Sequence, residues 1–281
     1  MEFTESFRAM NTDIDAIIDA PSRPLDAFLT LRLLFEQQEE RFSRFRPSSF
    51  LSRLNAGEVI DDRLFAAGCR LALEAYSFTG GVFNPMVLNA LTAAGYGTSF
   101  ERVHGGQPQE QSVPDPGTAL VIEGTSVRLI DGALDLGGIV KGWTVDLGIE
   151  ALRGTYPNLC INAGGDLRCE GAEAGVDGWE MAIAGSEDDE EVIWQGPMRG
   201  ALATSTTQRR RWVTDSGSEA HHLIDPRTGL PAVSPFVQVS AWATETWRAE
   251  CWAKAVLIGG EPAKGRAERA GVRVLAVAGI R

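Results

Sequence analysis

Features typical of membrane proteins and of disulfide-rich proteins are missing from this chain. In 281 residues no window holds 18 uninterrupted apolar residues, so we expect no membrane-spanning helix. The N-terminal stretch has no basic start followed by an apolar segment, which predicts a cytoplasmic protein. The cysteines form no C-x-x-C pair and no dense framework, so we expect reduced, mostly packed thiols. They are Cys69, Cys160, Cys169 and Cys251.

Positive charge is also scarce. The chain has 26 Lys and Arg against 38 Asp and Glu, a formal net charge of −12. This field opposes the approach of nucleic acid or anionic lipid, so we expect neither partner and no direct membrane insertion. An anionic small ligand remains compatible with the sequence where local Arg, Lys or backbone N–H groups reverse the field inside a pocket.

Several common catalytic motifs are absent. No G-x-S-x-G occurs and the chain has only three histidines, which argues against a serine or cysteine hydrolase. Neither G-x-x-x-x-G-K-[ST] nor a Rossmann G-x-G-x-x-G is present. The apolar content of 44% is ample for a hydrophobic core, and we expect one domain spanning 1–281.

The spacing of apolar residues predicts strands and hairpins mixed with helices. Between 94 and 116 the chain is rich in Gly, Pro, Gln and Ser, which predicts a long irregular segment and a candidate connection between two lobes. This mixture favours an α+β fold with mixed or antiparallel sheets and packed helices. Strands are predicted within 7–20, 159–163, 179–184, 201–204 and 236–242, a hairpin at 118–130, and helices within 22–47, 61–79, 139–153, 244–258 and 262–270.

A glycine pair lies at a position suited to binding a phosphate. Gly137-Gly138 precedes a predicted helix, so bare backbone N–H groups and the helix N-terminus can face an anion, while Lys141 adds a mobile charge. The alternative is an ordinary structural turn, which a single glycine pair does not exclude.

The order of three motifs is more specific than any one of them. The segments LDLGGIVKGWTVD, NAGGD and HHLIDPRTGLP follow one another as in the ApbE family, which this chain resembles. Other blocks resemble that family as well, so the resemblance covers nearly the whole chain. They are Met10-Asn11-Thr12, Phe42-Ser43-Arg44-Phe45, Ser52-Arg53-Leu54-Asn55, Gly81-Val82-Phe83-Asn84-Pro85 and Ala203-Thr204-Ser205.

The resemblance implies a T-fold-like α+β domain that binds FAD. In this family FMN is moved from FAD onto a Thr or Ser hydroxyl of an acceptor flavoprotein subunit, and AMP leaves. The protein then has to neutralise the pyrophosphate, align the acceptor and remove its proton. The positions that match the family and would bind the flavin nucleotide are Met10, Thr12, Asn84, Asp135, Gly137, Gly138, Lys141, Gly164, Gly165, Asp166, Ser205, Arg209 and Arg227.

The resemblance places three residues in the chemistry. His222 is the candidate for removing the proton from the acceptor hydroxyl, with a structural histidine as the alternative. On a strand His221 would point to the opposite face, so only one of the two histidines should face the site. Asp225 and Thr228 are assigned to catalysis, although Asp-Pro and Thr-Gly also favour turns for backbone reasons.

Arginines follow two of these motifs. Arg227 could reach a phosphate bidentately, but an exposed Arg in a turn needs no ligand. Arg209 best matches the family's Arg, whereas Arg210 is predicted to be solvated on an edge strand.

Two positions depart from the family moderately. Asn84 stands where the family has Asp, and Thr206 where it has Gly. The first change removes a negative charge, and the second constrains a turn that glycine would leave free.

The family's magnesium site departs from its usual pattern in this chain. There, an Asp and a Thr four residues later on a helix bind Mg²⁺ together with a main-chain carbonyl. Glu250, Lys254 and Val140 occupy these positions here. A protonated lysine offers no lone pair, which argues against a Mg²⁺ ion held as in the family.

Two interpretations of the Glu250–Lys254 pair stay open. It is an ordinary i, i+4 helix pair, or the Lys254 ammonium occupies the metal's place and meets the flavin pyrophosphate. Correspondingly, the sequence supports two functions: an FMN transferase, or a flavin-binding or regulatory protein on the same scaffold that no longer transfers.

Overall fold

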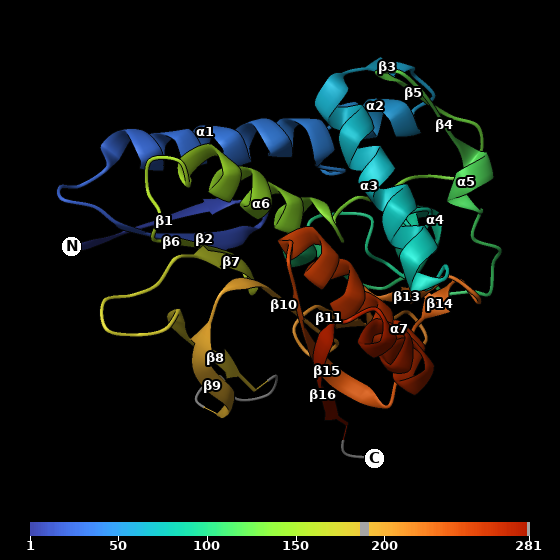
Figure 1. Ribbon diagram of the computed structural model, residues 1–281. Coiled ribbons are helices and arrows are strands. Elements are labelled where there is room, and N and C mark those ends of the chain that lie inside the picture. The colour runs from blue at the N-terminus through green and yellow to red at the C-terminus, as the bar shows by residue number, and fades with distance from the viewer. Residues whose placement is uncertain (186–190, 280–281) are drawn as a thin grey trace.

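The computed structural model describes residues 1–185 and 191–279 and is built on one seven-stranded sheet (Figure 1). Its strand order is β1-β2-β6-β7-β10-β15-β16, and every neighbouring pair is antiparallel. The predicted α+β class with antiparallel sheets and packed helices is confirmed. The strands are β1 (Glu2–Ala9), β2 (Thr12–Asp19), β6 (Leu159–Ala163), β7 (Asp166–Glu170), β10 (Gly200–Thr206), β15 (Phe236–Ala243) and β16 (Arg273–Ala278).

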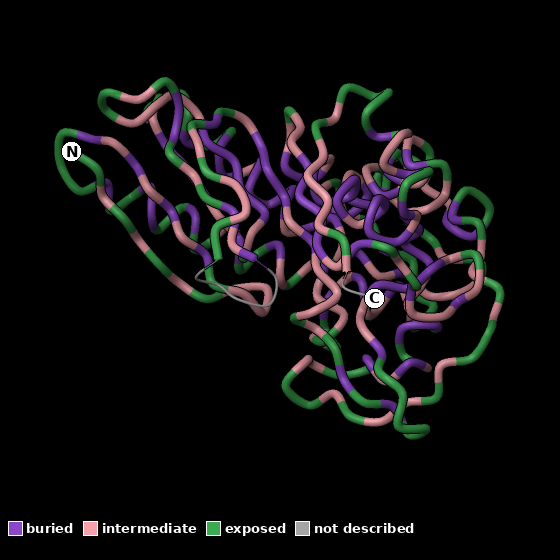
Figure 2. Tube along the Cα trace, turned by 90° about the horizontal axis from the view of Figure 1, so that it is seen from below, coloured by how far each residue is buried: buried purple, intermediate pink, exposed green. Residues whose placement is uncertain are grey.

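Each face of the sheet is covered by a different kind of element. Helices α1 (Leu25–Phe42), α6 (Val140–Leu152) and α7 (Thr246–Arg269) pack on one face, where alternate strand residues such as Ile14 and Ile161 are buried against them. The ribbon of β8 (Trp179–Ala184) and β9 (Val192–Met198) covers side chains of the other face, including Leu167 and Leu202. Buried segments accordingly gather in the interior (Figure 2).

The helix boundaries follow local capping. Helix α3 (Arg63–Thr79) begins at Asp62, whose carboxylate accepts the Phe65 N–H at 2.8 Å, and it ends at Gly80 with φ 69°, as predicted. Helix α1 stops earlier than expected because Ser43 is extended, with φ −74° and ψ 118°. Phe45, expected on this helix, therefore lies in the following loop.

Helix α7 combines two predicted helices. Gly260 has φ 62° and breaks the helical geometry, so the predicted segments 244–258 and 262–270 form two arms joined at a kink. The first arm carries Glu250 and Lys254.

One expectation about the cysteines is wrong. Cys160 and Cys169 form a disulfide, because β6 and β7 place them directly opposite each other. This strand pairing was not available from residue spacing. Cys69 and Cys251 are buried free thiols, as predicted.

The predicted irregular segment is largely without regular structure and packs against a small hairpin. Only the short η1 (Phe100–Arg102) and the start of α5 (Pro116–Ala119) interrupt it, and Trp212 donates its indole N–H to the Ala94 carbonyl at 2.8 Å. In the part of the chain that the structure describes, no helix has the length and apolarity needed to cross a bilayer.

The remaining elements are short. They are α2 (Phe50–Asn55), α4 (Leu88–Ala93), β3 (Ile60–Asp61), β4 (Leu120–Glu123), β5 (Ser126–Leu129), β11 (Arg211–Val213), β12 (Glu219–His221), β13 (Ile224–Asp225) and β14 (Leu230–Pro231). The pair β4–β5 is the hairpin predicted at 118–130.

Candidate functional site

A cavity of about 630 Å³ lies at one end of the central sheet. Two tight turns form part of its wall. Between β1 and β2, Met10 and Asn11 both have positive φ, at 51° and 58°, and between β6 and β7 Gly164 and Gly165 do so at 62° and 93°. A side chain at Gly164 would overlap Thr12 Oγ1, so the two turns approach closely only because this residue is glycine.

Most of the predicted site residues meet at this cavity, although they come from distant parts of the chain. The exceptions are Glu250, which lies behind the wall, and three residues of the Asp225 turn. The predicted residues that line the cavity are Met10, Thr12, Asn84, Asp135, Gly137, Gly138, Val140, Lys141, Gly164, Gly165, Asp166, Ser205, Arg209, His222 and Lys254.

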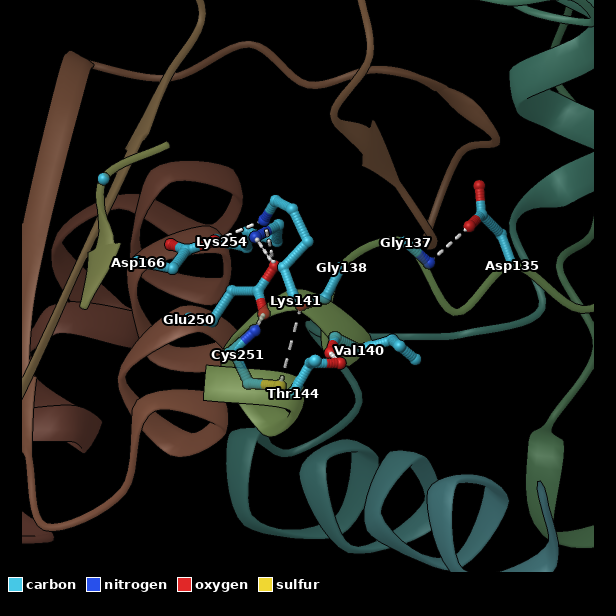
Figure 3. A network of polar contacts seen from close by, with 12 residues as sticks. Asp135, Gly137, Gly138, Val140, Lys141, Thr144, Asp166, Glu250, Cys251 and Lys254 are labelled. Atoms are coloured by element: carbon cyan, nitrogen blue, oxygen red, sulfur yellow. Dashed lines mark hydrogen bonds and ion pairs between the residues drawn. The ribbon is translucent and has the colours of Figure 1, made fainter. Parts of the chain in front are cut away.

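Four charged side chains form a compact network in the wall. Glu250 is fully buried, and its Oε1 accepts hydrogen bonds from Lys141 Nζ at 2.9 Å and Lys254 Nζ at 3.0 Å. Lys141 also forms an ion pair with Asp166. Figure 3 shows both lysines converging on the one carboxylate. The network thus contains two positive and two negative charges.

The environment keeps Glu250 ionised. Burial opposes its charge, but Lys141 and Lys254 outweigh burial and lower the pKa of Glu250 to about 2. Burial also disfavours the charge of Lys141, yet Asp166 and Glu250 raise its pKa above the ordinary value. The pKa of Asp166 shifts upward, because of burial and the neighbouring Glu250 charge. Glu250, which contacts both ammonium groups, is therefore more strongly held in its ionised form than Asp166.

Helix α7 is fixed by α6, which sets the position of Glu250. Buried Asp146 of α6 caps α7: its Oδ1 accepts the Thr246 N–H at 2.9 Å and its Oδ2 the Trp247 N–H at 3.1 Å. At Gly142 the two helices nearly touch, since a side-chain Cβ there would lie 2.8 Å from the Thr246 carbonyl carbon. The Gly142 N–H donates to Glu250 Oε2 at 2.9 Å.

The residues present do not fit a divalent metal ion. Both oxygens of Glu250 are engaged, Asp166 is paired with Lys141, and the Val140 carbonyl accepts the Thr144 hydroxyl at 2.7 Å. Over 1–185 and 191–279, no group of three or more His, Cys, Asp or Glu side chains could hold a metal. Lys254, at a position where a metal ligand is expected, carries an ammonium that offers no lone pair, and the Lys141 ammonium lies beside it on the same carboxylate.

The glycine turn before α6 differs from the expected cradle of bare N–H groups. The Gly137 N–H donates to Asp135 Oδ1 at 2.7 Å, and the N–H groups of Ile139 and Val140 both donate to the Leu136 carbonyl at 3.1 Å. Gly138 matters for another reason: a Cβ there would lie 3.3 Å from Lys254 Cδ. Glycine therefore leaves room for the Lys254 side chain to cross the turn.

The two positions expected to depart from the family pattern fit their local structure. Asn84 donates through Nδ2 to the Pro114 carbonyl at 3.2 Å and accepts the Met86 N–H at 2.8 Å, a combination that an ionised Asp cannot provide. Thr206 lies in β10 and its φ is not positive. The expected strain from replacing glycine at that position is therefore absent.

The two neighbouring histidines point to different environments, as predicted. His221 Nε2 contacts the Ala232 carbonyl at 3.0 Å, whereas His222 lines the cavity. The His222 Nδ1 atom is buried and has no hydrogen-bond partner among the described residues. Burial, with the charges of Arg210 and Lys254, holds the pKa of His222 well below 6.5, so its imidazole is neutral at neutral pH.

The Asp225 turn lies outside the cavity wall. Asp225 Oδ1 accepts the Arg227 N–H at 2.9 Å, and the Arg227 guanidinium forks onto the same carboxylate, with Nη2 to Oδ2 at 2.6 Å. Thr228 Oγ1 accepts the Leu230 N–H at 3.2 Å. These contacts build the turn, and the structure does not bring Asp225, Arg227 or Thr228 to the cavity.

Two arginines contribute more than the sequence indicated. Arg210, expected in solvent, is half-buried and lines the cavity. Arg44 lies 4.2 Å from the Phe45 ring centroid and 4.5 Å from that of Tyr96, and it pairs with Asp135 at 3.2 Å. Arg44 belongs to a family-like block, which is the signal that could have identified it.

Comparison with known proteins agrees with this arrangement. The ApbE family model matches residues 10–276. The FAD:protein FMN transferase of Vibrio cholerae is 26% identical over 242 residues, covering 81% of this chain and 72% of the relative. The protein of the same name from Treponema pallidum is 27% identical over 263 residues, covering 80% of this chain and 69% of the relative.

Solved structures share the fold. The ApbE protein of Thermotoga maritima superposes with a TM-score of 0.87 at 21% identity, covering 99% of this chain and 94% of that one. The flavin transferase ApbE of Vibrio cholerae gives a TM-score of 0.80 at 22% identity, with coverage of 99% and 94%. The match of the family model over nearly the whole sequence identifies the relationship: this chain belongs to the ApbE family.

Proposed function

We propose that this protein binds FAD and transfers its FMN portion to a Thr or Ser hydroxyl of a target flavoprotein, with release of AMP. The observation that carries the proposal is the cavity in which Lys141, Lys254 and neutral His222 meet, in a chain whose curated relatives are named FAD:protein FMN transferases. A cavity of about 630 Å³ falls in the range of small-molecule sites.

The reaction is a phosphoryl transfer. The acceptor oxygen forms a bond to the phosphorus of the FMN portion, the bond from that phosphorus to the bridging oxygen breaks, and AMP leaves with the electron pair. The hydroxyl proton must go to a base. His222 can accept it, because its imidazole is neutral and lies in the cavity wall.

Other residues would bind and orient the dinucleotide. Lys141, Lys254 and the arginines Arg209 and Arg210 supply positive charge along one part of the wall of an otherwise acidic protein. Phe45 and Tyr96 supply aromatic surface to the same cavity, suited to a planar ring system. We also propose that the Asp225 turn acts indirectly, by holding the strand end that carries His222.

The direct test is incubation of the purified protein with FAD, with and without Mg²⁺, and a flavoprotein acceptor peptide. An FMN mass increment on a Thr or Ser of the acceptor is expected. Tight FAD binding without any increment in either condition would rule out the transferase and leave a flavin-binding protein.

That second function has one specific observation in its favour. Both oxygens of Glu250 are occupied by Lys141, Lys254 and Gly142, so the residues that would hold a catalytic metal in the family are engaged otherwise. The mass assay separates the two functions. The cytoplasmic location stays a prediction that cell fractionation checks, and assignment of 1–281 to one domain is checked by a single unfolding transition.

A further inference from the structure

The lysines of this chain are few, and their placement is specific. Among 26 basic residues only Lys141, Lys254 and Lys264 are lysines. Two of these three contact the same carboxylate oxygen of Glu250, and both line the cavity. Lysine differs from arginine in carrying a compact point charge that a single carboxylate oxygen can hold.

We infer that Lys254, anchored by Glu250, is a built-in cation that binds the flavin pyrophosphate, so that FAD binding by this protein requires no divalent metal. The inference rests on the proposed function for the identity of the ligand. Its basis is that one of the positions expected to coordinate a metal is Lys254 itself, and that another, Glu250, accepts hydrogen bonds from both Lys254 and Lys141.

The anchoring leaves Lys254 able to meet a ligand. Its side chain is 13% exposed, and its contact with Glu250 at 3.0 Å uses one of three ammonium hydrogens. The side chain crosses Gly138, where a Cβ would lie 3.3 Å from Cδ and 3.5 Å from Cε. Glycine at 138 therefore lets the Lys254 side chain pack closely against the turn.

Glu250 accepts hydrogen bonds from two ammonium groups, and the pairing of Lys141 with Asp166 balances the second positive charge. Lys141 forms an ion pair with Asp166 and donates to Glu250, so the four charges cancel before any ligand enters. A divalent ion would add two positive charges beside two ammonium groups and find no carboxylate oxygen of Glu250 unoccupied. An anion instead meets the exposed side of the lysines.

The first experiment measures binding to the intact protein by calorimetry in EDTA and in excess MgCl₂. FAD and inorganic pyrophosphate are the two probes, and Mn²⁺ binding is followed separately by electron paramagnetic resonance. FAD affinity is expected to change by less than about threefold between the two conditions, with no stoichiometric Mn²⁺ bound. Binding of FAD only when Mg²⁺ is present, or one tightly bound Mn²⁺, would overturn the inference.

The probes separate this inference from the proposed function. Pyrophosphate binding in EDTA without FAD binding would refute the assignment of FAD as the ligand. It would still support Lys254 as a group that binds a diphosphate without a metal. FAD binding that is strictly magnesium-dependent would keep the flavin assignment and refute the built-in cation. If neither probe binds in either condition, both fail.

Variants test the role of the ammonium itself. Lys254→Met is expected to weaken pyrophosphate and FAD binding by about tenfold or more, while Lys254→Arg, which keeps the charge, retains more of it. The double variant Glu250→Asp with Lys254→Thr removes the ammonium and supplies oxygen ligands. In this double variant Mn²⁺ binding and a magnesium-dependent FAD affinity should appear. Unchanged FAD affinity in folded Lys254→Met, verified by circular dichroism, would contradict the assignment.

Discussion

Replacing Glu250 by Gln removes the charge that holds the lysine network together. In the native protein Oε1 accepts hydrogen bonds from two ammonium groups and Oε2 accepts the Gly142 N–H. The glutamine side chain has only one oxygen, which can accept either from the two lysines or from the Gly142 N–H. Its NH₂ group then faces the donor that is left without an acceptor. Lys141 and Lys254 are left with Asp166 as the carboxylate in the network, so repulsion between them increases.

Two independent estimates give the size of the effect. Removing one partner of a buried ion pair typically costs about 3–5 kcal/mol. The fall in the pKa of Glu250 from 4.5 to about 2 corresponds to a preference for the ionised form of roughly 3 kcal/mol. We therefore expect Glu250→Gln to lower the free energy of unfolding by about 3 kcal/mol, a large share of the roughly 5–15 kcal/mol typical of a domain.

The assay is urea unfolding at neutral pH with linear extrapolation to water. The matched control is Glu261→Gln on the same helix, because Glu261 pairs with Lys264 at 4.0 Å on the surface and its side chain is 68% exposed. That control should change stability by less than about 0.5 kcal/mol. A loss below about 1 kcal/mol in Glu250→Gln would refute the argument that this buried carboxylate neutralises two partly buried ammonium groups.

The same residue predicts a dependence on pH. The pKa of Glu250 is lower in the folded protein than the ordinary 4.5, so the unfolded chain takes up the proton first as the pH falls. The stabilisation is fully present above pH 4.5 and is lost between 4.5 and about 2. Glu250→Gln should show a weaker loss of stability over that window than the wild type, measured by urea unfolding at several pH values.

Three further substitutions test other parts of the site. Gly142→Ala should destabilise by about 1–3 kcal/mol, because its Cβ meets the Thr246 backbone, whereas Gly154→Ala, with open space around it, should have little effect in thermal melts. His222→Asn should lower FMN transfer by about 100- to 10,000-fold while leaving FAD affinity nearly unchanged; equal losses in both would contradict its role as base. Asn84→Asp should cost about 1–3 kcal/mol in urea unfolding, since the carboxylate would face the Pro114 carbonyl, and a neutral result would show that this hydrogen bond is unimportant.

The sequence was sufficient to predict those features that depend only on residues close together in the chain. The sequence narrowed the start of α3 to Asp61 or Asp62, of which the structure uses Asp62, and placed its end before Gly80, because capping depends on a few neighbouring residues. Short strand-like runs located β6 and β8 at their observed bounds. The disulfide between Cys160 and Cys169 could not be read in this way, because it depends on which two strands pair.

The site shows the same division. Most of the site residues that the ordered motifs identified line the cavity, and the motifs marked Glu250 and Lys254 as an expected departure from the family pattern. Side-chain identity alone also showed that Lys254 cannot ligate a metal, since this follows from the chemistry of an ammonium group.

Only the tertiary structure decided how the charges are shared. It brought Lys141 of α6 and Asp166 of β7 to Glu250 of α7, from positions 109 and 84 residues apart in the sequence, and so turned an expected two-residue helix pair into a buried four-charge network. It also removed Asp225, Arg227 and Thr228 from the cavity wall and brought Arg210 into it. Such contacts depend on the packing of α6 and α7 against the sheet and on the path of the chain after β10, which no local pattern encodes.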